Sequence, residues 1–413
     1  MSLPVPSYEE LSYDWGSSAL PSSFRGVVDE TIRDGLQVPF APALSLEQKK
    51  CLIGLSGDSK VSDILIGTVG AADNDGDLVP LIEFSANVIQ PWVLCRLRET
   101  DIQQLINIQD RAGVSVGLNL FIALSDLRRY VEGWDLEQIF SELESCLSLG
   151  GRHFSQIRVA FEDATRTHPE TLARAQQIVI YGGATRLTIA DTAGIATPLT
   201  VRRLFEFLKR ERLTLKETKC ALEWHGHNDR GLGIANTLES IQCGASYVHG
   251  TMMGVGERNG NAGLEVILLN LSLELKDRFN WAALRVYHDA CKDLFADVLA
   301  ESYPYFGENT FVTATGTHGA AIKKALDLHR PDLAARLYSP PSVLTGSCEP
   351  TILLSPLSGR RAVEALLYEL GTAPDVALIS ELLSLARSEN RTLSKNEVLD
   401  FLCARASSSI LSG

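Results

Sequence analysis

The stretch Ala-Leu-Glu-Trp-His-Gly-His-Asn-Asp, residues 221–229, decides the fold because it joins a buried strand directly to a group of polar side chains. An apolar run leads into it, and His225, His227 and Asp229 follow one another closely. In an extended chain alternate side chains point the same way, so the two imidazoles lie on one face. The stretch therefore predicts a strand whose carboxyl end carries chemically active groups.

Short apolar runs rich in β-branched residues recur before and after this stretch, separated by longer amphipathic segments. This alternation is typical of parallel strands joined by crossover helices. We predict about eight strands, at residues 26–29, 61–66, 92–95, 114–121, 157–161, 187–190, 221–225 and 247–251. Helices are predicted between them, for instance at residues 46–55, 136–149, 169–179, 199–210 and 233–243.

Eight strand–helix units over about 260 residues fit an α/β fold of the (β/α)8 TIM-barrel type better than an open doubly wound sheet. The positions of polar residues strengthen this prediction. Barrel active sites are built at the carboxyl ends of the strands. At or just after those predicted ends lie Asp29, Glu162, Asp191, His225 and Thr251.

Beyond the barrel the pattern changes to helices interrupted by Gly and Pro. We predict an N-terminal extension over residues 1–24, a catalytic barrel over 25–295, a linker subdomain over 296–348 and a small helical C-terminal subdomain over 349–413. The barrel is therefore expected to be followed by small, mainly helical subdomains.

Composition narrows the functional classes. The formal net charge is −13, with acidic residues spread along the chain, which disfavours nonspecific binding to nucleic acid. No apolar run approaches the roughly 20 residues of a membrane helix, and the first 24 residues lack the pattern of a secretory leader. The eight cysteines stand singly, so we predict buried thiols in a reducing cytoplasm. These features indicate a cytoplasmic protein that acts on small molecules.

His225 and His227 form the strongest local signal. At positions i and i+2 of a strand, both imidazoles can reach one cation at roughly 2.0–2.1 Å. The alternative is that one ring only packs or bonds a carbonyl oxygen, as single histidines commonly do. A pair at a strand end favours the interpretation as metal ligands.

The loop after the first predicted strand, residues 29–37, reads Asp-Glu-Thr-Ile-Arg-Asp-Gly-Leu-Gln. Asp34 can supply an anionic metal ligand, and Arg33 a fixed positive charge for an oxygen on which negative charge develops. Taken alone, the two residues fit a surface ion pair at least as well.

The loop after the eighth predicted strand, residues 254–262, contains three glycines and Asn261. Its spacing is G-x-G-x-x-x-G and it lies at the end of the sheet, which excludes a dinucleotide-binding loop. Glycines let the backbone approach a ligand closely, and the amide of Asn261 can complete an oxygen-rich coordination shell.

Two further segments, residues 161–166 and 191–198, are weaker signals. Glu162 can take part in proton transfer, and Thr192 can bond a substrate carboxylate. Asp163 and Asp191 fit helix capping at least as well as chemistry.

Taken together, the segments at residues 29–37, 161–166, 191–198, 224–229 and 254–262 resemble the acyl-CoA condensing enzymes of the 2-isopropylmalate synthase and homocitrate synthase family, which share a metal-binding TIM barrel. The resemblance extends from residue 26 to residue 268 and continues weakly to residue 346. It implies a Claisen-type condensation of acetyl-CoA with a 2-oxo acid, and the chain is most similar to a short 2-isopropylmalate synthase without the regulatory domain.

Carried over residue by residue, the resemblance implies Asp34, His225 and His227 as protein ligands of a divalent metal, which the ligand types leave open as zinc, manganese or magnesium. Asn261 would lie on or beside this metal. Arg33 would stabilise developing charge and contact the substrate.

The resemblance also assigns roles outside the ligand set. Glu162 matches a catalytic carboxylate, and Thr192 matches the threonine that holds the carboxylate of the 2-oxo acid. His318, at the end of the segment 311–318, matches a histidine that assists proton transfer, and Tyr338 matches its tyrosine partner. In the family these last two groups reach the barrel of the partner subunit, so the resemblance implies a homodimer with shared active sites.

Several residues depart from the family pattern, which usually has a glutamate, a proline, two histidines and a serine at the positions of Leu65, Val69, Asn119, Arg128 and Thr315. Because a polar substrate group would find no partner at Leu65, we predict a branched aliphatic substrate. We expect 2-oxoisovalerate, giving 2-isopropylmalate on the route to leucine, with homocitrate and citramalate formation as alternatives.

Two other functions compete. One is carbon–carbon cleavage by a related metal-dependent lyase, such as one acting on hydroxymethylglutaryl-CoA. Those relatives carry a cysteine in the glycine loop after the last strand, which residues 254–262 lack. The other is a non-catalytic ligand-binding homologue, against which the intact Arg33, Asp34, His225 and His227 argue.

Overall fold

The computed structural model describes residues 6–11, 20–38, 41–70, 75–215, 219–271, 279–295, 303–304, 312–338 and 351–411. The chain forms two compact units, residues 18–299 and residues 1–17 together with 300–413. The domain boundaries predicted at residues 296 and 348, and the predicted limit of the family resemblance at residue 346, fall outside the described residues.

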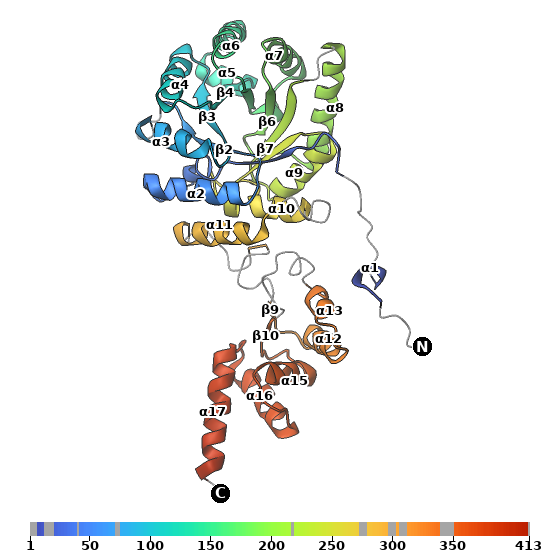
Figure 1. The fold of residues 1–413 in the computed structure, drawn as a ribbon. Coiled ribbons are helices and arrows are strands. Elements are labelled where there is room, and N and C mark those ends of the chain that lie inside the picture. Colours follow the sequence, from blue (N-terminus) through green and yellow to red (C-terminus); the bar gives the residue numbers. More distant parts are fainter. Residues whose placement is uncertain are drawn as a thin grey trace. The chain divides into compact units, whose positions relative to one another are not determined.

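The first unit is a closed barrel of eight parallel strands in sequential order, as predicted (Figure 1). Each strand pairs with the next, and β8 closes the barrel on β1, with Gly26 beside Tyr247 and Asp29 beside Gly250. The strands are β1 (Gly26–Asp29), β2 (Asp63–Thr68), β3 (Gln90–Arg96), β4 (Gly117–Ala123), β5 (Ile157–Glu162), β6 (Arg186–Asp191), β7 (Ala221–Gly226) and β8 (Tyr247–Gly250).

The strand starting points differ from prediction by three residues at β4 and by two residues at β2 and β3. The strand predicted at residues 114–121 begins only at Gly117, because Gly113 ends the preceding helix in a left-handed conformation and the chain must turn before it can pair. The strand predicted at residues 61–66 is shifted to Asp63–Thr68, with a register irregularity between Leu65 and Gly67 opposite β3.

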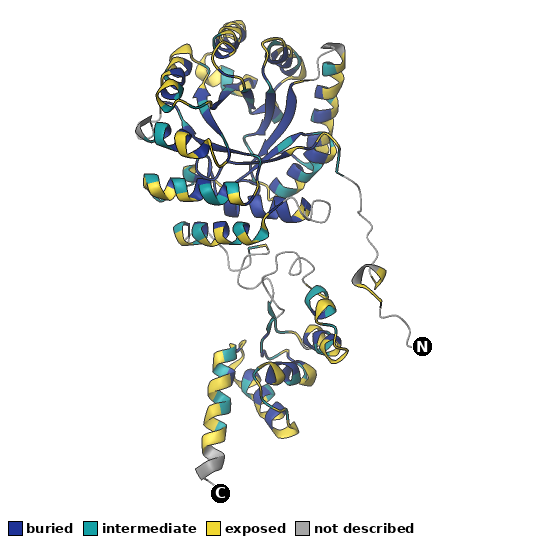
Figure 2. Cartoon of the chain, viewed as in Figure 1, coloured by how far each residue is buried: buried dark blue, intermediate teal, exposed yellow. Residues whose placement is uncertain are grey.

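Helices surround the barrel and turn their buried faces toward the strands (Figures 1 and 2). Helix α2 begins at a complete capping box formed by Ser45 and Gln48, and the side chain of Asp135 caps α6. The helices are α2 (Leu46–Asp58), α3 (Asp75–Ser85), α4 (Glu99–Ala112), α5 (Asp126–Glu132), α6 (Leu136–Gly150), α7 (Pro169–Tyr181), α8 (Pro198–Leu215), α9 (Gly233–Gln242), α10 (Leu264–Leu271) and α11 (Trp281–Leu294).

Charged side chains fill part of the barrel interior near the amino-terminal ends of the strands. Arg158 on β5 and Glu223 on β7 are fully buried, with 2.7 Å between Nε and Oε2. Arg186 on β6 bridges Glu223 and Asp63, at 3.1 Å and 2.9 Å. Trp92 packs against both guanidinium groups, 4.1 Å and 4.8 Å from its ring centre. These groups form a connected set of ion pairs inside the barrel.

The second unit is mainly helical after a short parallel pairing of β9 (Val312–Thr313) with β10 (Thr351–Ile352), in agreement with the predicted helical C-terminal region. Its buried core is an aliphatic cluster that includes Ile322, Leu366 and Leu382. The described helices are α1 (Tyr8–Leu11), α12 (Gly316–Asp327), α13 (Pro331–Arg336), α15 (Arg360–Glu369), α16 (Val376–Glu389) and α17 (Lys395–Leu411).

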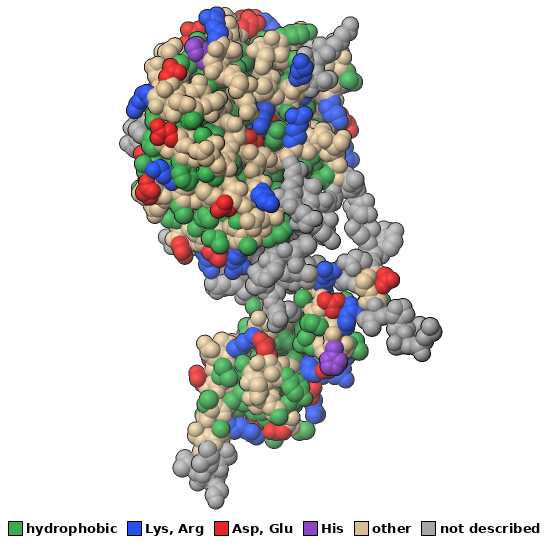
Figure 3. Space-filling view, viewed as in Figure 1, with side chains coloured by type: hydrophobic (Ala, Val, Ile, Leu, Met, Phe, Trp, Pro, Cys, Tyr) green, Lys and Arg blue, Asp and Glu red, His purple; other side chains and the backbone are tan. Residues whose placement is uncertain are grey.

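The prediction that the cysteines are buried is only partly confirmed. Cys51 on α2 and Cys403 on α17 are exposed, and Cys243, in the turn after α9, is half-buried. Cys348 lies outside the described residues. Acidic and basic side chains are interspersed over the visible face of the barrel (Figure 3). Among the described helices, none is both long and apolar enough to cross a bilayer.

Candidate metal centre and active site

Three candidate ligands meet at the carboxyl ends of the barrel strands. One ligand atom from each of Asp34, His225 and His227 lies within 4.8 Å of the other two, and all three residues are buried. Nε2 of His225 lies 3.4 Å from Nε2 of His227 and 3.9 Å from Oδ2 of Asp34. The fold thus brings together residues separated by about half the chain.

The turn after β1 positions Asp34. The backbone amides of Arg33, Asp34 and Gly35 all donate to the carbonyl oxygen of Glu30, at 2.8–3.1 Å. This tight turn directs the carboxylate of Asp34, which is 2% exposed, toward β7. A side chain at position 35 would come within 2.8 Å of Val255, so glycine permits the close packing of this turn.

The second histidine lies just beyond its strand. β7 ends at Gly226, and His227 pairs with Asn261 in an isolated antiparallel bridge. The side chain of Asn261 donates to Oδ2 of Asp34 at 2.5 Å. The loop after β8 therefore connects to both other segments of the site.

Glycine is required where this loop folds back on itself. Gly260 has a φ of +77°, and a Cβ there would lie 1.9 Å from the carbonyl oxygen of Gly254. The same carbonyl accepts the backbone amide of Asn261 at 2.9 Å. The glycines of the 254–262 segment therefore place the Asn261 amide beside Asp34.

The donor set fits a divalent cation. Burial lowers the pKa of His225 and of His227 to about 4, so both rings carry a free lone pair at neutral pH. Burial alone would raise the pKa of Asp34, but Arg33 and the two histidines lower it to about 2. Oδ1 of Asn261 is buried and has no hydrogen-bond partner among the described residues. One carboxylate, two imidazoles and one amide oxygen are ligands that zinc, manganese and magnesium accept to different degrees.

Arg33 is engaged by both neighbouring carboxylates. Its guanidinium pairs with Glu30 and lies 3.1 Å from Oδ1 of Asp34, and its side chain is 14% exposed. Burial lowers the pKa of Arg33. The positive charge is therefore fixed at the edge of the candidate metal site.

Glu162 lies at the end of β5, and its side chain is 24% exposed rather than fully buried. Burial raises its pKa, while the guanidinium of Arg128, 3.3 Å away, acts in the opposite direction. Thr192 accepts a hydrogen bond from the backbone amide of Asp163 at 2.8 Å. The carboxylate of Asp191 accepts the amides of residues 195 and 196, which lie in the loop before α8, so it does not cap this helix as the sequence had allowed. Thr197 takes that place by accepting the amide of Thr200.

A cavity of about 840 Å³ opens beside Glu162. Phe121, Arg96, Arg128 and Trp134 contribute to its lining. Its volume lies within the range of roughly 300–1,000 Å³ that is usual for small-molecule sites.

The departures from the family pattern have different structural consequences. Leu65 is fully buried against Val28 and Trp92 in the barrel core, and it does not line the cavity beside Glu162. Its apolar side chain therefore gives no support to the prediction of an aliphatic substrate. Since Asp29 pairs with Ile64, Glu30 follows at the level of Leu65, so a buried carboxylate is supplied there by β1.

The other departures differ in burial. Asn119 is 3% exposed and Val69 1% exposed, and Oδ1 of Asn119 has no partner among the described residues. Thr315 is exposed at the start of α12 in the second unit.

His318 and Tyr338 lie together in the second unit. Their rings stack with centres 3.9 Å apart and planes inclined by 20°. His318 is exposed and Tyr338 is 44% exposed. The structure therefore brings these two predicted partners into contact with each other.

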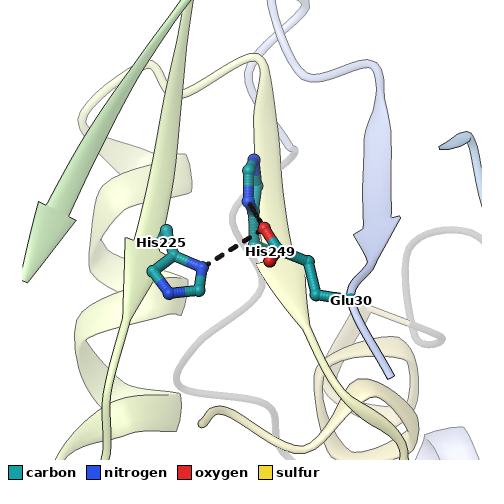
Figure 4. Close-up of side chains that lie close together, drawn as sticks. All are labelled: Glu30, His225 and His249. Atoms are coloured by element: carbon teal, nitrogen blue, oxygen red, sulfur yellow. Dashed lines mark hydrogen bonds and ion pairs between the residues drawn. The ribbon is translucent and has the colours of Figure 1, made fainter. Parts of the chain in front are cut away.

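The sequence prediction missed a second histidine cluster. Glu30, His225 and His249 meet inside the barrel, where Oε1 of Glu30 lies 2.5 Å from Nδ1 of His249 and 3.4 Å from Nδ1 of His225 (Figure 4). The alternation of side chains along β8 was the available signal, because residue 249 falls on the same strand face as residue 247, which packs inside the barrel. The pairing of Arg128 with Glu162 was missed as well.

Comparison with known proteins places this chain in a family. Residues 26–287 match the sequence profile of the HMGL-like family. A 2-isopropylmalate synthase of Sediminispirochaeta smaragdinae is 29% identical over 82% of this chain and 66% of its own length. A 2-isopropylmalate synthase of Methylacidiphilum infernorum is 30% identical over 84% of this chain and 67% of its own length. The chain thus spans about two thirds of the length of these curated relatives.

Solved structures agree on the barrel. The HMG-CoA lyase of Bacillus subtilis superposes with a TM-score of 0.56 and 17% identity, covering 67% of this chain and 95% of the lyase. At this level of identity the likeness concerns the fold. The HMGL-like profile, in contrast, spans more than half of the chain, and the protein therefore belongs to the HMGL-like family.

Proposed function

We propose that the protein is a metal-dependent enzyme that joins the methyl carbon of acetyl-CoA to the keto carbon of a 2-oxo acid and releases CoA. The observation that carries this proposal is the convergence of Asp34, His225 and His227 at the carboxyl end of the barrel. The curated relatives support it, since those named above are 2-isopropylmalate synthases.

Asp34, His225 and His227 would hold a divalent ion, and Asn261, whose amide nitrogen contacts Asp34, lies beside this set. Such an ion supplies a Lewis acid for the keto group of the 2-oxo acid. Arg33 adds a fixed positive charge at the edge of this site, which favours the oxygen that becomes negative during the attack.

Proton transfer is assigned to Glu162 or His318. A carboxylate oxygen of Glu162, or a ring nitrogen of His318, accepts a methyl proton of acetyl-CoA. The carbon that loses the proton attacks the keto carbon, and water then cleaves the thioester to give the free acid and CoA. Thr192 would bind the carboxylate of the 2-oxo acid. Under this proposal the protein is a homodimer in which His318 and Tyr338 serve the partner's barrel.

The 2-oxo acid proposed is 2-oxoisovalerate, which gives 2-isopropylmalate, a precursor of leucine. The support is the name of the curated relatives. Homocitrate and citramalate synthesis use the same chemistry on 2-oxoglutarate and pyruvate and remain alternatives for the same site.

A thiol-release assay tests the reaction. Purified protein is incubated with acetyl-CoA, with zinc, manganese or magnesium, and with 2-oxoisovalerate, pyruvate or 2-oxoglutarate in turn. We expect release of CoA that depends on both the metal and the 2-oxo acid, highest with 2-oxoisovalerate, and a product of the corresponding mass. CoA release with none of these acids, together with cleavage of hydroxymethylglutaryl-CoA, would identify a lyase instead. Inertness toward every substrate would indicate a non-catalytic homologue.

Substitution of the histidines tests the ligand assignment. His225→Ala and His227→Ala should each lose metal binding and turnover while keeping the circular dichroism spectrum of the folded protein. His153→Ala removes an exposed histidine of the barrel surface and serves as the control. Full activity of either ligand variant after removal of metal would contradict the assignment.

A further inference from the structure

Glu30 is a buried carboxylate at the meeting point of three side chains. It is 2% exposed. Its Oε1 lies 2.5 Å from Nδ1 of His249 and 3.4 Å from Nδ1 of His225 (Figure 4). Its Oε2 pairs with the guanidinium of Arg33. One side chain therefore contacts a candidate metal ligand, a second histidine and the arginine at the edge of the site.

The two nitrogens of His225 face different partners. Nε2 points to the candidate metal site, 3.4 Å from Nε2 of His227 and 3.9 Å from Oδ2 of Asp34. Nδ1 faces Glu30. A carboxylate behind a metal-binding histidine fixes which ring nitrogen carries the proton and holds the ring in orientation.

His249 fixes Glu30 in turn. Its Nε2 lies 3.1 Å from Oε2 of Glu223, which is fully buried and paired with Arg158 at 2.7 Å. The rings of His225 and His249 meet nearly edge-on, at 76° with centres 5.5 Å apart. A continuous set of polar contacts therefore connects the ion pairs of the barrel interior to His225.

A second metal ion among Glu30, His225 and His249 is the alternative, because their ligand atoms also lie within 4.8 Å of one another. Both ring nitrogens of His249 already face carboxylates. Oε2 of Glu30 is engaged by Arg33. A second cation would have to displace these contacts and lie next to a guanidinium, which the charges disfavour.

We propose that Glu30, anchored by His249, is a positioning residue that holds His225 with its proton on Nδ1 and its Nε2 directed at a single divalent ion. This inference rests on the proposed function, because it concerns the metal site of that function. It assigns Glu30 and His249 no contact with substrate.

Metal affinity measured without substrate tests this role. The wild type and Glu30→Gln are titrated with zinc and with manganese in competition with a chelator. The amide keeps the size of the side chain and removes its charge, so the dissociation constant should rise by about 10- to 100-fold, with one ion per chain retained. The matched control is Glu265→Gln, which changes a fully buried carboxylate whose partners among the described residues are His288, at 3.3 Å, and the backbone amide of Met253, and not a candidate ligand. The control should bind metal like the wild type.

Unchanged metal affinity of Glu30→Gln would overturn the inference, and so would an equal loss of metal affinity in Glu265→Gln. A fall from two bound ions per chain to one would also overturn it, because Glu30 would then be a metal ligand. If Glu30→Gln does not fold, His249→Gln decides, since it leaves Glu30 in place but removes its anchor. A measurable loss of affinity supports the role, and unchanged affinity refutes it.

The metal-affinity test of Glu30 and the thiol-release test of the proposed function can fail independently of each other. Weaker metal binding by Glu30→Gln in a protein that shows no thiol release would leave the inference standing and refute the function. Unchanged metal binding by Glu30→Gln, in a protein that does release thiol, would refute the inference and leave the proposed function standing. A wild type that binds no divalent ion would refute both.

Discussion

The interior of the barrel and the core of the C-terminal helices are both buried, but the barrel interior contains charged side chains and the helical core contains aliphatic ones. The barrel encloses Asp63, Arg158, Arg186 and Glu223 in connected ion pairs. The second unit encloses an aliphatic cluster around residues such as Leu382. Figure 2 shows buried residues both on the barrel strands and on the helices of the second unit.

The charged side chains of the barrel fix the positions of neighbouring groups more than they add to the free energy of unfolding. Apolar burial is non-directional, so it holds helices together without fixing individual atoms. A pair between a guanidinium and a carboxylate fixes the geometry of both groups, although a buried pair adds little net stability compared with a well-packed apolar core. In the barrel the fixed groups include Glu223, which contacts His249.

Breaking the charged interior should have the largest effect. Burial opposes ionisation of Glu223, but Arg158, His249 and Arg186 lower its pKa below the usual range. Glu223→Gln leaves two buried guanidinium groups without this carboxylate, so the free energy of unfolding should fall by about 3–5 kcal/mol. Urea denaturation measures this change. Unaltered stability would show that the remaining partner Asp63 and the new amide suffice.

Breaking the aliphatic core should have an effect of equal or smaller size that is confined to the second unit. Leu382 is fully buried, and Leu382→Ala removes apolar contacts at a cost of about 2–5 kcal/mol. Hydrogen exchange should show lost protection in residues 360–411, with the barrel strands and metal affinity unchanged. Exchange that increases equally in β1–β8 would mean that the two units do not unfold independently.

The ion pair between Arg128 and Glu162 lies between these extremes, with side chains 41% and 24% exposed. Arg128 favours the charged form of Glu162, so Arg128→Gln should raise the pKa of this carboxyl. If Glu162 accepts the proton, the acidic limb of the pH profile of kcat/KM should move to higher pH. The control is Arg129→Gln, which breaks the ion pair between Arg129 and Asp126 and leaves Arg128 unchanged. An unmoved limb would assign the proton to another group.

A fully exposed pair should have the smallest effect. Arg174 pairs with Glu137 across the outer surface of α7 and α6, with side chains 50% and 66% exposed. Exposed pairs are screened by water and salt. Glu137→Gln removes the charge of the pair and leaves Arg174 on the ring of Phe140, 4.5 Å from its centre, so it should leave the urea midpoint and the activity unchanged. A clear loss of stability would show that surface pairs matter here as much as buried ones.

The sequence by itself determined the barrel and the nearest candidate ligands. Alternation between apolar runs and amphipathic helices is a local pattern, and it was enough to predict eight strands and their order. His225 and His227 are two residues apart, and Asp34 lies in the loop after the first strand, so their common position at one end of the barrel follows from strand direction. The stacking of His318 on Tyr338 accords with their predicted partnership.

Only the tertiary structure decided which distant side chains meet. Glu30 and His249 are 219 residues apart, and Asp63 and Arg186 are 123 apart. Whether such residues touch depends on strand register and on which side chains turn into the barrel, and no local pattern contains this information. For the same reason Leu65, interpreted from the sequence as part of the substrate pocket, proved to be a core residue. A one-residue change of register would have turned Leu65 out of the barrel toward the surrounding helices, because neighbouring residues of a strand face opposite sides of the sheet.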